Sequence, residues 1–358
     1  MKSLFDSVTV GGVTLKNRII RSATLERPQD ESGSFLPGLE PIYENLARGG
    51  VGAIITGMMG VNGNSRLYPS MIDTFGRHFV PELRALAERV HAHGCKIVVQ
   101  LSHCGIKVPY GENGEAPVAP SETDLGDGKK ARAITREEIA ALATGFADAA
   151  ARCREAGADA VQLHAAHGYL LSQFLSPYYN KRTDEYGGDI AGRSHALSEV
   201  YDAVRAKVGN DYPVWMKINS TDRVDESSTW EEVLWVCTDL AKRGMDAIEL
   251  SGGISVDAKS SSAQPVKAES DEGIYAQKAI ELAAAAPVSV ISVCGYRTPA
   301  VINEWLNKGD IAGISLCRPL IREPGLVARW QGGDTSKPTC ISCNKCFRPK
   351  HGFGCQIA

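Results

Sequence analysis

The feature that most constrains the fold is a recurrence of eight short apolar runs, each followed by a segment of helical character. Within each run apolar residues are nearly continuous, which is typical of parallel strands covered on both faces. The runs occupy residues 18–24, 52–58, 96–101, 160–165, 214–219, 247–253, 288–293 and 311–316. Eight strand-and-helix units close a barrel, so we predict an α/β fold of the (β/α)8 type.

The segments between the runs carry the start and stop signals of helices. Residues 135–157 begin with Thr135 and Glu138, the pattern of a capping box, and residues 229–244 begin in the same way. Pro299 opens a further helix at its first position. The alternative, a doubly wound sheet, would favour a Gly-x-Gly-x-x-Gly turn after the first strand, which this sequence lacks.

Three additions extend the predicted barrel. The opening segment reads as a hairpin around Gly11-Gly12. The long loop at 102–134, rich in Gly, Pro and Asp, follows the third strand, and a loop of this length usually caps a site. We therefore divide the chain into a barrel at 1–330 and a short Cys-rich tail at 331–358.

Composition excludes several classes of protein. The chain has 358 residues and a net charge of −3, and this near balance argues against a nucleic-acid surface or a basic membrane patch. The amino terminus has no continuous apolar segment of a signal peptide, and no run reaches the roughly 18 apolar residues of a membrane span. These features predict a cytoplasmic protein.

The ten cysteines fall into two groups. Six are scattered through apolar or glycine-rich stretches, where free thiols act as small hydrophobic side chains. The other four crowd into the tail as Cys340, Cys343, Cys346 and Cys355. Four thiolates at this spacing can bind an iron–sulfur cluster or structural zinc, and a tail without metal is the third reading.

The ends of the predicted strands indicate where a ligand would bind, because barrels of this kind place their sites there. Strands seven and eight end in "VCGYR" and "LCRP", where bare amides and Arg318 can face a phosphate. Gln100 ends strand three and suits the edge of a heterocycle, whereas Lys217 in strand five supplies positive charge. Together they favour a phosphorylated heterocyclic cofactor such as FMN.

The stretch "VQLHAAHGYL" places His164, His167 and Tyr169 at the end of strand four. Zinc hydrolases with two close histidines usually carry His-Glu-x-x-His on a helix, whereas here alanines intervene on a strand. Positions three apart on a strand face opposite ways, so only a turn at its end lets both rings face one pocket. From these residues alone, metal ligands, a hydrogen-bonding clamp and ordinary packing all remain open.

The ordered motifs extend from about residue 3 to 330 and resemble the old yellow enzyme family of FMN-dependent oxidoreductases. They are "LKNRIIRSAT", "GAIITG", "IVVQLSHCGIK", "PVAPSE", "HAAHGYLLSQFLSPYYNKRTDEYGG" and "LCRPLIREP". The resemblance implies FMN as the cofactor, NADH or NADPH as the reductant and an α,β-unsaturated carbonyl compound as the substrate. It implies flavin contacts by Ser22, Ala23, Thr24, Gly57, Gln100, Lys217, Gly295, Cys317 and Arg318.

The same resemblance assigns the ring cluster a role. His164 and His167 match residues that bind the substrate carbonyl, and Tyr169 matches a proton donor. The sequence also departs from the family: Leu25 replaces a threonine or cysteine that bonds the flavin, and Lys217 stands where many relatives have arginine. Lysine keeps the charge but loses the bidentate fork.

The tail resembles a compacted form of the iron–sulfur segment in the dienoyl-CoA reductase and trimethylamine dehydrogenase branch. The leading hypothesis is therefore an NAD(P)H-dependent ene-reductase. An electron-transfer flavoprotein, pairing FMN with a tail cluster and a redox partner, is the second. A barrel that binds a phosphorylated metabolite without redox chemistry is the third. A homo-oligomer is compatible with each of them.

Overall fold

The computed structural model describes residues 1–26, 28–111, 115–347 and 353–357. Its centre is a closed barrel of parallel strands, in which each strand pairs with the next and β10 pairs with β6. The barrel strands are β3 (Ile19–Arg21), β4 (Ala53–Ile55), β6 (Lys96–Ser102), β10 (Ala160–Ala165), β11 (Val214–Asn219), β12 (Ala247–Ser251), β13 (Ser289–Val293) and β14 (Gly313–Leu316). The predicted (β/α)8 barrel is confirmed, with several strands shorter than their apolar runs.

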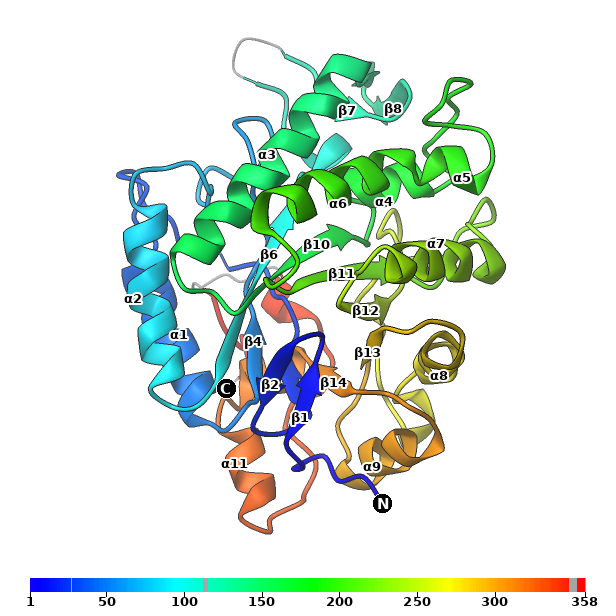
Figure 1. The fold of residues 1–358 in the computed structure, drawn as a ribbon. Coiled ribbons are helices and arrows are strands. Elements are labelled where there is room, and N and C mark those ends of the chain that lie inside the picture. Colours follow the sequence, from blue (N-terminus) through cyan, green and yellow to red (C-terminus); the bar gives the residue numbers. More distant parts are fainter. Residues whose placement is uncertain (27, 112–114, 348–352, 358) are drawn as a thin grey trace.

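Helices follow the strands and pack around the outside of the barrel (Figure 1). The longer ones are α1 (Leu36–Arg48), α2 (Phe79–His91), α3 (Arg136–Glu155), α6 (His195–Val208), α7 (Trp230–Lys242), α8 (Ala276–Ala285) and α9 (Pro299–Lys308). Both predicted capping boxes form, at Thr135 and at Thr229, and Pro299 is the first residue of α9. Short helices complete the set: α4 (Leu170–Leu175), α5 (Ile190–Arg193), α10 (Arg318–Arg322) and α11 (Leu326–Gln331).

The predicted hairpin closes the amino-terminal end of the barrel (Figure 1). Strands β1 (Val8–Val10) and β2 (Val13–Leu15) pair antiparallel around Gly11-Gly12. The Gly11 carbonyl accepts a 3.1 Å hydrogen bond from Trp215 Nε1, and its amide donates to Ser289 Oγ. Because these partners stand at the starts of β11 and β13, the hairpin seals this end, and a ligand site must lie at the other.

Inside the barrel, side chains change from apolar to polar along each strand. Residues near the hairpin, such as Val98, Trp215 and Ala247, form a buried apolar cluster. Side chains on one face of a strand recur every second residue, so the next inward positions are Gln100, Lys217 and Glu249. The polar layer therefore lies toward the carboxyl ends of the strands.

The long loop after β6 forms a small sheet of its own. Strands β7 (Val118–Ala119) and β8 (Thr123–Gly126) both pair with β9 (Lys129–Ala133). Among the described residues, those that line the main cavity include none from this sheet. The described residues of this small sheet therefore do not line the cavity. Nearer the start of the loop, the short helix η1 (Gly105–Lys107) contacts the site through Lys107, as described below.

The tail folds back onto the carboxyl end of the barrel. Arg297, next to β13, donates hydrogen bonds to the Cys340 carbonyl and to Ser342 Oγ. Arg318 Nη1, in α10, donates a 2.8 Å bond to Asn344 Oδ1. The tail thus packs on the corner formed by the last two strands. Within the described part of the chain, no helix combines the length and apolar character needed to cross a bilayer.

Candidate active site

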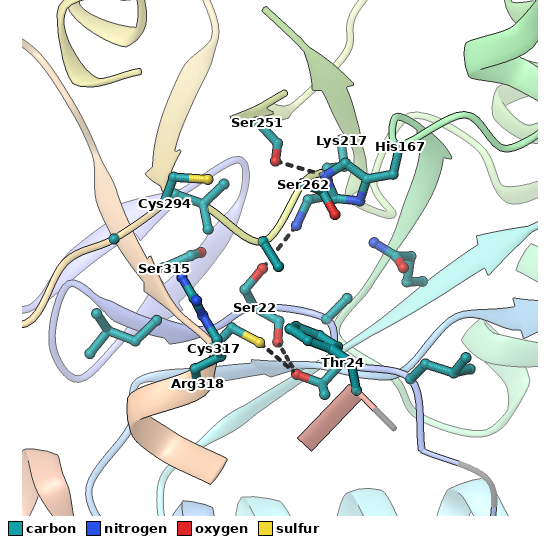
Figure 2. Close-up of a pocket in the computed structure, with 18 of the residues that line it drawn as sticks. Ser22, Thr24, His167, Lys217, Ser251, Ser262, Cys294, Ser315, Cys317 and Arg318 are labelled. Atoms are coloured by element: carbon teal, nitrogen blue, oxygen red, sulfur yellow. Dashed lines mark hydrogen bonds between the residues drawn. The ribbon is translucent and has the colours of Figure 1, made fainter. Parts of the chain in front are cut away.

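A cavity of about 240 Å³ opens at the carboxyl ends of the strands (Figure 2). Eleven of the twelve predicted catalytic and flavin-binding residues line it: Ser22, Ala23, Thr24, Gln100, His164, His167, Tyr169, Lys217, Gly295, Cys317 and Arg318. Ser262 and Ala263, from the loop after β12, and Phe347 of the tail lie in the same wall. The loop after β12 and the tail therefore contribute to the lining of the cavity.

Gly57 is the predicted residue that does not line the cavity in the described structure. Its amide donates a 3.1 Å hydrogen bond to the Tyr43 hydroxyl, and a Cβ here would lie 2.6 Å from the Thr24 carbonyl oxygen. Glycine at this position thus allows the strand end to pass close to the 22–24 turn. Its neighbour Met58 lines the cavity, as does Leu25.

The three ring side chains of the β10 end lie together. The ring centroids of His164 and His167 are 5.2 Å apart at nearly a right angle, and the Tyr169 ring lies 4.8 Å from that of His164. Strand β10 ends at Ala165, and His167 then adopts a left-handed backbone conformation with φ of 63°. This is the turn that brings both histidines to one pocket.

Burial controls the protonation of these rings. Desolvation, and then the nearby Lys217 ammonium, hold the pKa values of His164 and His167 well below their usual range. Both imidazoles are therefore neutral near pH 7, and each can donate one N–H bond. Desolvation raises the pKa of Tyr169, so its hydroxyl stays protonated and available as a donor.

Two residues that the sequence reasoning missed hold this cluster in place. Lys107 Nζ donates a 2.7 Å hydrogen bond to the His167 carbonyl and lies 4.7 Å from the centroid of the Tyr169 ring. Ser251 Oγ is 2.8 Å from His167 Nε2. Ser251 ends strand six at an inward position, a signal that the sequence contained, whereas nothing local linked Lys107 to Tyr169.

A buried polar network lies in the layer beneath the cavity. Lys217 Nζ is 3.1 Å from Glu249 Oε2 and donates a 2.9 Å hydrogen bond to Ser22 Oγ. Gln162 Nε2 donates to the same carboxylate, and Gln100 Nε2 donates to Gln162 Oε1. Gln162 and Glu249 were also missed, although each lies two residues before an inward-facing residue of the site.

The opposite corner fits a phosphate group. Gly295 has φ of 88°, which suits glycine, and Cys317 Sγ lies 3.1 Å from Thr24 Oγ1. Arg318 lines the corner, and the Gln264 carbonyl and Asn344 Oδ1 hold its guanidinium group. Cys294 lies beside them, and burial raises its pKa to about 11, so this thiol is protonated.

The lining of the cavity fits FMN. His164 Nδ1 and Ser315 Oγ are buried cavity atoms without a hydrogen-bond partner among the described residues, and buried polar atoms of this kind call for a polar ligand. Figure 2 shows Ser251, Lys217 and His167 on one side of the cavity and Cys317 and Arg318 on the other. This is the donor set that a heterocycle carrying a phosphate requires.

The four tail cysteines line a second, smaller cavity of about 30 Å³, and Arg318 belongs to the walls of both cavities. Arg322 Nη1 lies 3.8 Å from Cys355 Sγ, and Arg297 Nη2 lies 3.9 Å from Cys340 Sγ. Burial raises the pKa of Cys346 to about 11. In the described parts of the chain, no group of three or more His, Cys, Asp or Glu is arranged to hold a metal ion.

A third buried histidine, His103, makes stability depend on pH. Burial lowers its pKa to about 4, and its Nδ1 accepts a hydrogen bond from the Gly105 amide. Below about pH 6.5, His103 binds a proton in the unfolded chain but stays neutral in the folded state. The free energy of unfolding should therefore fall as pH drops from 6.5 toward 4, by about 1.4 kcal/mol per pH unit for each such histidine.

Urea unfolding at pH 7.5, 6.0 and 5.0 measures this loss. The His103→Asn variant keeps an acceptor for the Gly105 amide but does not titrate, so its stability should decline less steeply. Equal slopes for the variant and the original chain would show that His103 is protonated in the folded state.

Comparison with known proteins places this chain in a family. Residues 3–336 match the model of the NADH:flavin oxidoreductase / NADH oxidase family. The chain belongs to this family, which confirms the resemblance seen in the sequence and supports FMN and NAD(P)H as cofactor and reductant. The fold is shared with the old yellow enzyme homologue of Zymomonas mobilis, at a TM-score of 0.76, 24% identity and coverage of 95% and 96% of the two chains.

Two curated relatives show the range of similar proteins. A metal reductase of Desulforamulus reducens is 34% identical over 347 residues, which are 96% of this chain and 51% of that protein. An NADPH dehydrogenase of Halalkalibacterium halodurans is 34% identical over 257 residues, or 71% of this chain and 74% of that protein. The chain spans about half the length of the first of these.

Proposed function

We propose that the protein is an FMN-dependent oxidoreductase that uses NAD(P)H to reduce the activated C=C bond of α,β-unsaturated carbonyl compounds. The observation that carries this proposal is the cluster of His164, His167 and Tyr169 in the wall of the cavity. Two neutral N–H donors beside a protonated phenol suit a substrate whose oxygen gains negative charge while its carbon gains a proton.

Each ring side chain has a separate task in this reaction. His164 and His167 donate hydrogen bonds to the carbonyl oxygen and stabilise the enolate-like charge that grows on it, as an oxyanion hole does. Tyr169 Oη gives its proton to the α-carbon. Lys107, held 4.7 Å from the ring centroid, supports the tyrosine in this position and stabilises negative charge that develops on its oxygen.

FMN, when bound, supplies the hydride that the β-carbon receives and is itself reduced by NADH or NADPH. Ser22, Gln100 and Lys217 would face its ring, while Gly295, Cys317 and Arg318 would hold its phosphate. Leu25 lines the same cavity, and its side chain would offer the flavin ring no hydrogen bond.

Anaerobic titration of the FMN-loaded protein with NADH and with NADPH tests the proposal, followed by turnover with 2-cyclohexenone. We expect flavin bleaching with at least one nucleotide and its reoxidation by the enone without a protein partner. Protein that stays colourless after flavin addition would favour a metabolite-binding barrel, and bleaching without enone turnover would contradict the ene-reductase assignment.

A second candidate function is electron transfer between FMN and a metal cluster in the tail. The observation that favours it is the cavity lined by Cys340, Cys343, Cys346 and Cys355, which shares Arg318 with the main cavity. Arg297 and Arg322 approach two of these thiols, and positive groups favour thiolates. The raised pKa of Cys346 means that metal binding would release its proton.

Elemental analysis of anaerobically purified protein decides between the readings of the tail. The electron-transfer candidate predicts iron and acid-labile sulfide, both lost in a Cys343→Ala/Cys346→Ala variant. Cys237→Ala, which removes a buried thiol of α7, is the matched control and should keep them. Zinc without sulfide would support a structural zinc site. Protein that contains neither iron nor zinc would exclude both metal readings of the tail.

A further inference from the structure

A carboxylate lies inside the barrel where the proposed reaction gives it no task. Glu249, in the middle of β12, is 0% exposed, and Lys217 beside it is 3% exposed. Burying an ion pair costs desolvation energy that a pair of apolar side chains would avoid, so the pair calls for an explanation other than stability. Its position directly beneath the cavity suggests one.

The contacts of Glu249 satisfy both of its oxygens. Oε1 accepts a 2.8 Å hydrogen bond from Ser22 Oγ, and Oε2 accepts a 3.0 Å bond from Gln162 in addition to its 3.1 Å contact with Lys217. Gln100 joins the network through Gln162. Three residues assigned to the flavin ring, namely Ser22, Gln100 and Lys217, are thus linked through one carboxylate.

The charge of Glu249 changes what Lys217 can do. An uncompensated ammonium group in a dry pocket would strongly stabilise a bound ligand that becomes anionic. Paired with a carboxylate at 3.1 Å, the ammonium is partly neutralised, and its field at the cavity is weaker than that of an unpaired ammonium. The lysine then acts mainly as a fixed hydrogen-bond donor.

We propose that Glu249 is a positioning residue that neutralises Lys217 and so keeps the reduction potential of the bound flavin low. The proposal rests on the flavin site proposed above. A low potential makes the reduced cofactor a stronger hydride donor toward an alkene. The same carboxylate orients the Ser22 hydroxyl and, through Gln162, the Gln100 amide.

Glu249→Gln tests the charge with little change in shape. Its amide oxygen can take the place of Oε2 and accept from Lys217 and Gln162, while its NH2 group donates to Ser22 Oγ. We expect the reduced-to-oxidised ratio of bound FMN, in equilibrium with a reference dye, to rise at least tenfold. That factor corresponds to about 30 mV for a two-electron couple. The protonation of reduced FMN, seen as a break in the potential against pH, should also shift to lower pH.

The double variant Glu249→Gln/Lys217→Gln separates charge from packing. It removes both charges, so the potential should return toward that of the original protein. The matched control is Glu199→Gln. Glu199 lies on the outer helix α6, and its carboxylate accepts a hydrogen bond from the Tyr186 hydroxyl, so this variant should leave the potential unchanged.

The outcomes distinguish this proposal from the proposed function. FMN bound with an unchanged potential in Glu249→Gln would overturn the role of Glu249 alone. A double variant whose FMN potential is shifted as far as that of Glu249→Gln would also overturn the role of Glu249. The shift would then come from packing rather than from charge. Failure of the original protein to bind FMN would overturn both proposals.

Discussion

Tyr169→Phe should lower the rate of enone reduction by about 10²- to 10⁴-fold, the usual contribution of a positioned general acid. The substitution removes the hydroxyl and keeps the ring, which packs against His164 and beneath the Lys107 ammonium. The flavin pocket therefore stays intact, and reduction of bound FMN by NAD(P)H should keep its rate. Stopped-flow measurement of the two half-reactions provides the test.

The matched control for this variant is Tyr212→Phe. Tyr212 is a buried tyrosine before β11, near the opposite end of the barrel, and its hydroxyl has no hydrogen-bond partner among the described residues. It should change neither half-reaction. Enone reduction at the original rate in Tyr169→Phe would mean that another group, or water, delivers the proton.

Arg21→Met should lower the free energy of unfolding by about 3–5 kcal/mol, the usual effect of removing one partner from a buried ion pair. Arg21 and Glu26 form such a pair, with side chains 2% exposed. Among the described side chains, the change would leave the buried Glu26 carboxylate with the 3.4 Å contact of the Tyr43 hydroxyl. The pair also holds the turn at 22–25 that lines the cavity, so flavin affinity should fall as well.

Urea unfolding of the flavin-free protein measures this effect. Adding Glu26→Gln to Arg21→Met removes the stranded charge and should restore part of the lost stability. Arg48→Met is the control, since Arg48 is 62% exposed and its pair with Glu44 on α1 should contribute no more than about 1 kcal/mol. If Arg21→Met lowered the free energy of unfolding by less than about 1 kcal/mol, the Glu26 side chain would be either hydrated or uncharged in the variant.

Much of the site could be predicted because a parallel barrel places every strand end on one face. Gln100, Lys217 and Arg318 are far apart in the sequence, yet each follows or ends an apolar run, and all three line the cavity. The ring cluster was expected from the family resemblance, because the strand pattern alone would point His164 and His167 opposite ways, and the left-handed turn at His167 brings them together. Gly57 was the exception. It packs closely against Thr24, and its neighbour Met58 lines the cavity instead.

The covers and supports of the site could not be predicted in this way. The loop after β6 is long and polar, but its length does not say where it packs, and it forms a separate small sheet. Residues 262–263 and Phe347 of the tail line the cavity instead. Lys107 contacts Tyr169 because η1 and the end of β10 lie side by side in the fold. Lys107 and His167, whose carbonyl it bonds, are 60 residues apart in the sequence.

The sequence by itself determined the barrel, its hairpin and the chemistry gathered at its strand ends, because apolar periodicity and helix caps are local properties of the chain. Only the tertiary structure decided that Glu249 neutralises Lys217, that Ser251 bonds to His167, and that Arg318 lies between the two cavities. The physical reason is that these contacts join side chains from different strands, helices and the tail. Their distances depend on how the barrel closes, which no short stretch of sequence records.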